Sequence, residues 1–117
     1  MKLTKSLLMA CFISVFLTTA GLASNMQMVK KGEKIFMTKS KGNCLACHAI
    51  EGKKVDGPGS LGPKLQYLSV WPEQALYNKV YDPYTTNPIS AMPAFGKSGW
   101  LSTEEIKAVV AYLQTIN

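Results

Sequence analysis

The chain has 117 residues, 47% of them hydrophobic, and it carries 13 lysines, no arginine and 7 carboxylates, for a formal charge of +6. This length allows one small domain, and such a domain buries only a modest core unless a metal, a disulfide or a cofactor adds to it. A mildly basic chain without arginine has little with which to grip phosphates, so we expect no nucleic acid partner.

The first 23 residues have the pattern of an export signal. Lys2 and Lys5 form a basic start, an apolar run covers residues 7–17, and Gly21-Leu22-Ala23 places small residues before a cleavage site. We predict a signal peptide over residues 1–23 that is cleaved after Ala23. The mature domain, residues 24–117, is then expected in the periplasm, with a formal charge of +4 from 11 lysines and 7 carboxylates.

Two alternatives concern the same segment. An uncleaved membrane anchor is one of them, but the apolar run is short for a transmembrane helix, so we expect no membrane span in the mature form. The other is lipidation, because Leu8-Met9-Ala10-Cys11 looks like a lipoprotein box. The apolar run continues past Cys11, and we therefore do not expect a lipid there.

The mature chain is predicted to begin with a helix over residues 26–39, capped by Ser24-Asn25. Val29 and Phe36 lie two turns apart on one face of this helix, and Gly32 lies between them. A glycine on an apolar face favours the close approach of another helix, for which the C-terminal helix is the expected partner. A tolerated surface glycine is the alternative.

Residues 44–48 are Cys-Leu-Ala-Cys-His, a C-x-x-C-H box. In an exported protein this spacing predicts the attachment of a c-type haem. Cys44 and Cys47 can add to the two vinyl groups of one haem, and the imidazole of His48 then faces the iron. We predict one covalently attached haem c, held in this way.

Other uses of these residues have less support, because removal of Cys11 with the signal leaves no further cysteine and the chain has no second histidine. A structural zinc ion needs four ligands, of which the box supplies three. A thioredoxin-like redox pair needs a βαβ setting, and a nucleophilic cysteine needs a separate histidine as base. A single bridge across two residues is the only disulfide possible.

The segment after the box is dense in turn-forming residues over 51–60 and leads to Gly62-Pro63. We predict that the carbonyl of Pro63 accepts a hydrogen bond from the second ring nitrogen of His48, which fixes the orientation of the imidazole. A plain turn is the alternative.

Further along, a short helical turn is expected over residues 65–68, and a longer helix runs from Pro72-Glu73 to Asp82-Pro83. Residues 83–99 form a long irregular segment, and such segments in compact domains are usually functional or disordered; its apolar residues argue against disorder. The last helix begins with a capping box and then carries apolar residues at helical spacing: Ser102 and Glu105, then Ile106, Val109, Val110 and Leu113. With no strand in view, the fold class is all-α.

The second axial ligand of the iron follows by elimination. His48 is the only histidine, so a methionine is the natural candidate. Met37 lies too close to the box to reach the far face of the haem, and Met26 and Met28 belong to a helix that packs elsewhere. We therefore predict Met92 as the axial ligand. A His/Met pair is typical of an electron carrier; a peroxidase or ligand sensor is the alternative if Met92 does not bind.

Taken together, these motifs resemble a class I cytochrome c over residues 26–117. Within that class, residues 42–50, 88–96 and 101–113 resemble SoxX, the small monohaem subunit of the SoxAX thiosulfate-oxidation complex. The resemblance implies the small class I cytochrome c fold, with helices wrapped around one covalent haem.

The resemblance also implies partners and a reaction. SoxX forms a periplasmic heterodimer with SoxA, and the complex, an L-cysteine S-thiosulfotransferase, joins thiosulfate to a cysteine of the SoxYZ carrier with the removal of two electrons. The reactive cysteine belongs to SoxA. This chain would be the electron outlet toward a downstream cytochrome acceptor and not catalytic alone.

A free soluble periplasmic cytochrome that shuttles electrons is the competing hypothesis. Lysines near the site could steer acidic partners to it, or they could form a solvated rim: Lys39, Lys41, Lys53 and Lys54. Four aromatic residues could be either interface anchors or walls of the haem pocket: Trp71, Tyr81, Tyr84 and Phe95.

Overall fold

The structure is a computed structural model that describes residues 21–117. The predicted signal peptide lies outside the described residues except for positions 21–23, and so does Cys11. The described chain contains a first helix over residues 21–37, α2 (Glu73–Tyr81) and α3 (Thr103–Leu113). Short 3₁₀ turns link them: η1 (Cys44–Ala46), η2 (Leu68–Val70) and η3 (Pro83–Thr85). These residues contain no strand, only one isolated parallel bridge between Ile50 and Leu65, and the all-α class is confirmed.

Two of the predicted boundaries are wrong. The first helix already includes residues 21–25, so Ser24-Asn25 does not cap it. The short turn expected over 65–68 lies instead at Leu68–Val70, because Leu65 bonds to the segment after the C-x-x-C-H box and Tyr67 adopts the left-handed region with φ of 56°. The start of α2 after Pro72 and its end at Tyr81 agree with the sequence.

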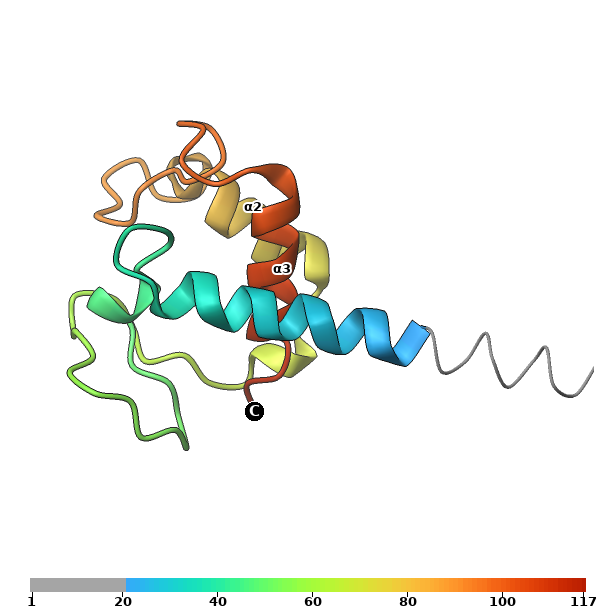
Figure 1. The fold of residues 1–117 in the computed structure, drawn as a ribbon. Helices are drawn as coiled ribbons and strands as arrows, with labels where there is room; N and C mark the ends of the chain where they lie inside the picture. Colours follow the sequence, from blue (N-terminus) through green and yellow to red (C-terminus); the bar gives the residue numbers. More distant parts are fainter. Residues whose placement is uncertain (1–20) are drawn as a thin grey trace, which may run out of the picture.

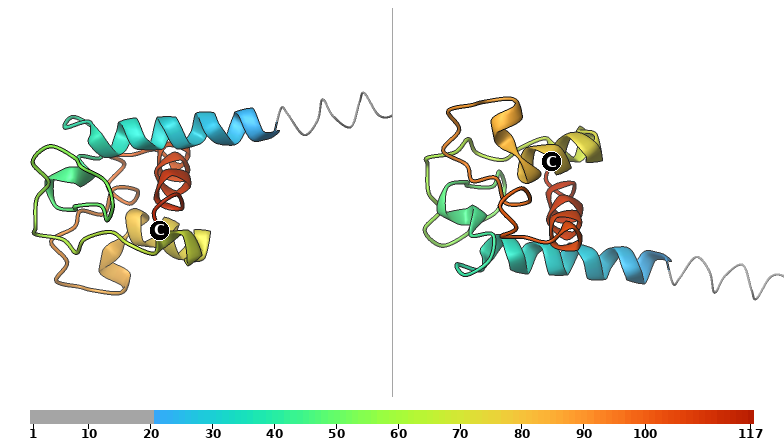
Figure 2. Two further views of the ribbon diagram at one scale, coloured as in Figure 1. Left: turned by 90° about the horizontal axis from the view of Figure 1, so that it is seen from below. Right: turned by 90° about the horizontal axis from the view of Figure 1, so that it is seen from above.

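The first helix lies across α3, and the contact between them depends on Gly32 (Figures 1 and 2). A Cβ atom at Gly32 would lie 2.5 Å from the carbonyl carbon of Ala108 and 2.9 Å from Cβ of Tyr112. The two backbones therefore touch at a distance that no side chain at position 32 permits. The prediction that Gly32 receives the C-terminal helix is confirmed.

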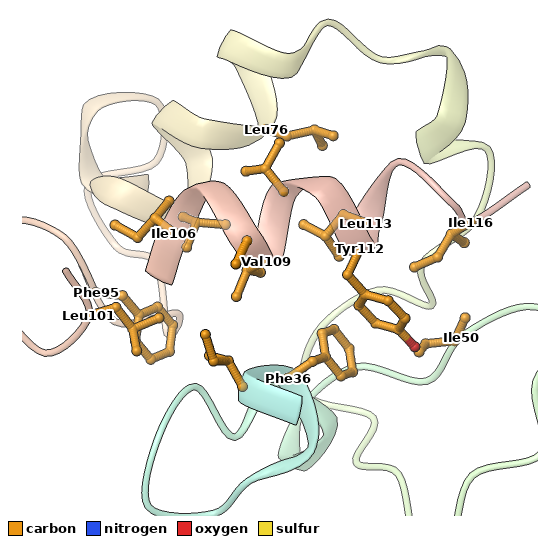
Figure 3. Packing of buried hydrophobic residues seen from close by; sticks show 14 residues of the cluster. Phe36, Ile50, Leu76, Phe95, Leu101, Ile106, Val109, Tyr112, Leu113 and Ile116 are labelled. Carbon is orange, nitrogen blue, oxygen red and sulfur yellow. The ribbon is translucent and has the colours of Figure 1, made fainter. Parts of the chain in front are cut away.

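The hydrophobic core is built around α3 (Figure 3). All four apolar residues predicted for its inner face are buried: Ile106, Val109, Val110 and Leu113. Phe36 from the first helix packs edge-on against the ring of Tyr112, with centroids 5.5 Å apart. Leu76 and Val80 add the buried face of α2.

The capping box at the start of α3 is present as predicted. Ser102 Oγ accepts from the backbone N–H of Glu105 at 3.2 Å, and Glu105 Oε2 accepts from the backbone N–H of Ser102 at 2.9 Å. Two backbone donors that the helix leaves free are thereby satisfied. The first residue of α3 is thus fixed by local chemistry.

Two irregular segments lie at the same end of the molecule, beyond the contacts between the helices (Figures 1 and 2). Both the segment that carries the C-x-x-C-H box and the segment 83–97 lie at the end away from the start of the first helix (Figures 1 and 2). Among residues 21–117, no helix has the length and apolar character needed to cross a membrane. The fold gathers both loops at one end of the molecule (Figures 1 and 2).

Candidate haem site

The C-x-x-C-H box begins with a single tight turn. Asn43 adopts the left-handed region with φ of 48°, and the backbone N–H groups of Cys47 and His48 then donate to the carbonyl of Cys44 at 3.1 and 2.9 Å. Side chains three residues apart in a 3₁₀ turn lie on the same side. The turn thus presents Cys44 and Cys47 in one direction, both as free, half-buried thiols.

The protonation of Cys44 argues against a catalytic nucleophile. Burial raises the pKa of Cys44 from 9.0 to about 12, and the neighbouring Cys47 thiol adds to the increase. Catalytic cysteines have the opposite environment, in which positive charge lowers the pKa. Within the described chain, no group of three or more His, Cys, Asp or Glu side chains is arranged to hold a metal ion.

The imidazole of His48 is oriented by a backbone carbonyl. Nδ1 of His48 lies 2.7 Å from the carbonyl oxygen of Pro63. A carbonyl only accepts, so Nδ1 carries the proton and the lone pair belongs to Nε2. The hydrogen bond expected from the sequence is therefore present, and it leaves Nε2 as the nitrogen able to bind iron.

The residue before Pro63 makes room for the ring. A Cβ atom at Gly62 would lie 2.8 Å from both Nδ1 and Nε2 of His48, so only glycine fits between the loop and the imidazole. The backbone N–H of Gly62 donates to the carbonyl of Cys47 at 2.9 Å. The loop is thus bound to the box itself, and the ring and its acceptor form one unit.

The same loop is tied to the box at two further points. The backbone N–H of Gly59 donates to Leu45 at 2.9 Å, and that of Leu65 donates to Ala49 at 2.8 Å. These bonds bring Leu65 to the edge of the core, where it is half-buried. The segment 51–65 therefore folds back on the box along its length.

Met92 lies in the other loop of this end. Its side chain is half-buried and packs against the hydrophobic core, as do Cys44, Leu65 and Leu68. The backbone N–H of Met92 donates to Ser90 Oγ at 3.1 Å. Cys44 from the box and Met92 from the far loop thus both border the same apolar cluster.

The other three methionines among residues 21–117 belong to the first helix. Met28 and Met37 are half-buried against the core, and Met26 is 60% exposed. None of them belongs to either loop.

The four aromatic residues left open by the sequence fall into two groups. Phe95 is buried in the core, whereas Trp71, Tyr81 and Tyr84 are between 40 and 52% exposed. Trp100, which the sequence did not single out, is also exposed and donates from Nε1 to the carbonyl of Lys41.

The residues present fit a covalently attached haem. Two free thiols share one side of a tight turn, the adjacent imidazole is held with its lone pair on Nε2, and glycine at position 62 keeps the space that the ring needs. Apolar side chains of the core border both loops, which is the surrounding that a porphyrin requires.

Comparison with known proteins agrees with this site. Residues 27–113 match the sequence model of the family described as "Cytochrome C oxidase, cbb3-type, subunit III". An "Uncharacterized lipoprotein" of Aquifex aeolicus (strain VF5) is 34% identical over an alignment of 96 positions, which covers 76% of this chain and 46% of that protein. The chain thus spans less than half the length of that relative.

A solved structure is similar as well. The chain described by "Crystal structure of SoxXA from P. pantotrophus" superposes with a TM-score of 0.65 at 31% identity, over 74% of this chain and 79% of that chain. The C-x-x-C-H box, the all-α fold and the family match all indicate a cytochrome c domain. This protein belongs to the cbb3-type subunit III family of cytochromes: it is a class I c-type cytochrome domain that carries covalently bound haem c.

Proposed function

We propose that this chain is the electron-transfer subunit of a SoxAX-type complex. The observation that carries the proposal is the similarity to the solved SoxXA structure, which covers 79% of the matched chain at 31% identity. The contexts of the box and of the Met92 loop, residues 42–50 and 88–96, support the same subfamily.

In this proposal five residues form the haem site. Cys44 and Cys47 would hold the haem through thioether bonds, Nε2 of His48 and Sδ of Met92 would bind its iron, and the carbonyl of Pro63 orients the His48 ring. The haem supplies a one-electron couple whose potential the methionine ligand raises. The protein binds and orients the group and keeps water from its apolar faces.

The reaction belongs to the complex as a whole. A SoxA-like partner would supply the reactive cysteine, and thiosulfate would be joined by a sulfur–sulfur bond to the carrier cysteine of SoxYZ with the loss of two electrons. This chain would receive those electrons one at a time and pass them to a downstream cytochrome.

Isolation of the protein from its native periplasm tests the proposal. A C-terminally tagged chain is purified at high salt, and its partners and haem content are identified by mass spectrometry. We expect one haem on this chain and a second haem-bearing chain in a one-to-one ratio. A stable monomer that never retains a SoxA-like chain would refute the assignment to a SoxAX-type complex.

A free electron shuttle is the second candidate, and the exposed lysines favour it. Lys39 and Lys54 are exposed and make no ion pair within residues 21–117. Lys41 pairs with Glu105 at 2.7 Å, and Lys53 donates to Tyr112 Oη at 3.1 Å. If the protein docks transiently through these lysines, the rate of electron transfer to its partner should fall steeply as the salt concentration rises. Electron transfer inside a stable complex should depend little on salt.

The location of the mature protein follows from the same proposal. Cleavage after Ala23 would release residues 24–117 to the periplasm. The mass of the mature protein from native cells tests this directly, because it should equal that of a chain that begins at Ser24 and carries one haem. A chain that begins at Cys11 and carries a lipid would overturn the cleavage site and would agree with the lipoprotein name of the relative from Aquifex aeolicus.

A further inference from the structure

The loop that carries Met92 is closed at its base by the end of α2. The backbone N–H groups of Gly96 and Lys97 both donate to the carbonyl of Tyr81 at 3.1 Å. Nζ of Lys97 lies 3.1 Å from Oδ2 of Asp82. Three polar contacts therefore join the last residues of the loop to the two residues that precede it.

Asp82 is an unusual member of this closure because it is buried. Among residues 21–117 it is the only buried polar or charged residue, with its side chain 10% exposed against 67% for Lys97. Its second oxygen, Oδ1, accepts from the backbone N–H of Tyr84 at 3.1 Å and caps η3. A buried carboxylate is costly unless it is paired and hydrogen-bonded, and both requirements are met here by residues at the two ends of the loop.

Two further hydrogen bonds order the chain on either side of the segment from Met92 to this base. Ser90 Oγ accepts from the backbone N–H of Met92 at 3.1 Å, and the backbone N–H of Leu101 donates to the carbonyl of Phe95 at 3.0 Å. Phe95 is itself buried in the core. Only three residues separate Met92 from Gly96, so a change at the base reaches the methionine through a short segment of chain.

We propose that Asp82 is a positioning residue of the electron-transfer site, which acts with Lys97 to close the base of the loop 83–97 and thereby holds Met92 on the haem iron. This inference rests on the proposal that Met92 is the axial ligand. Asp82 acts only through the loop and does not itself bind the haem.

Imidazole is a suitable probe of this closure, because it binds the iron only where Met92 has left. When a ligand binds one conformation of a protein, its apparent affinity is proportional to the population of that conformation. Asp82→Asn keeps an oxygen that can accept from Tyr84 but removes the charge that pairs with Lys97. We expect imidazole to bind the Asp82→Asn protein about 5 to 30 times more tightly than the wild type.

The experiment titrates the haem-loaded, oxidised proteins with imidazole and follows the visible spectrum. Lys97→Met changes an exposed residue and provides a second variant if Asp82→Asn does not fold; it should give a similar increase in affinity. Lys97→Arg keeps the positive charge, so its affinity for imidazole should stay within about twofold of the wild type. Lys107→Met removes an exposed ion pair with Glu104 on α3 and serves as the matched control, with no change expected.

A double-mutant cycle separates positioning from general loosening. Met92→Ala should itself raise the imidazole affinity, and Asp82→Asn should add nothing in that background. An equal effect of Asp82→Asn with and without Met92 would overturn the inference. So would a wild-type affinity in both Asp82→Asn and Lys97→Met while Met92→Ala binds tightly, and in that case Met92 ligation would stand. A wild-type affinity in Met92→Ala would overturn the ligation and this inference together.

Discussion

Nζ of Lys41 lies 2.7 Å from Oε1 of Glu105, and this ion pair joins the turn before the C-x-x-C-H box to the first turn of α3. The carbonyl of Lys41 also accepts from Nε1 of Trp100. Glu105 completes the capping box with Ser102 at the same time. The start of the last helix and the approach to the haem box are therefore held by one glutamate.

The pKa of Glu105 gives this ion pair a pH dependence. The hydrogen bond from Lys41, followed by that from the Ser102 backbone, lowers the pKa of Glu105 below its ordinary value of 4.5. A carboxyl whose pKa is lower in the folded state stabilises the fold above its ordinary pKa. That stabilisation is lost as the pH falls through the lowered value.

Glu105→Gln tests the charge alone, because glutamine also serves in a capping box. At pH 7 we expect a loss of about 0.2–1 kcal/mol in the free energy of unfolding, the range for exposed ion pairs. The difference between the two proteins should shrink as the pH falls through the lowered pKa of Glu105. Urea unfolding over a pH series measures it, and a loss as large at acidic pH as at pH 7 would contradict the explanation.

The contact between Gly32 and Ala108 predicts a larger effect on stability. In Gly32→Ala the new methyl group meets the backbone of α3, which has less freedom to move than a side chain. The gain of about 1 kcal/mol in helix propensity is outweighed, and the free energy of unfolding should fall by about 2 kcal/mol. Lys34→Ala, at an exposed position of the same helix, should change it by less than about 0.5 kcal/mol.

The axial assignment of Met92 predicts a change in ligand binding. In reduced Met92→Ala the sixth position of the iron is open, so carbon monoxide should bind and change the visible spectrum at concentrations that leave the wild type unaltered. The reduction potential should fall as well, because a methionine ligand raises it. Met28→Ala, which removes a half-buried methionine of the first helix, should leave both properties as they are.

Covalent attachment is tested by replacing the two thiols. The wild-type chain should keep the mass of one haem after denaturation, and the double variant Cys44→Ala, Cys47→Ala should lose it. Each single variant should keep the haem through one thioether bond. Retention of the haem by the denatured double variant would show that the attachment is elsewhere.

The elements that follow from local chemistry are the ones the sequence predicts well. The capping box of Ser102 and Glu105 and the apolar spacing after it depend on residues three or four positions apart. The C-x-x-C-H box is local in the same sense. The contact of Gly32 with α3 is not local, but it could be predicted because Gly32 lies on the apolar face of its helix.

The errors arise where distant contacts decide the structure. The turn expected over 65–68 is displaced because Leu65 bridges to Ile50, and no pattern near Leu65 reveals that partner. The ion pairs Lys41–Glu105 and Asp82–Lys97 could not be predicted from the sequence for the same reason. An ion pair between two loops has no period, so it becomes visible only once the path of the chain is known.

The contact of Gly32 with Ala108 joins a segment that is made before the haem box to one that is made after it. Chains emerge with the N-terminus first, so the first helix and the haem box both exist before α3 does. Until α3 is made, Phe36 lacks its contact with Tyr112, and Cys44 lacks the part of the core that α3 supplies. Docking of α3 then closes the core against Cys44. A segment made after the box thus completes the core that borders Cys44.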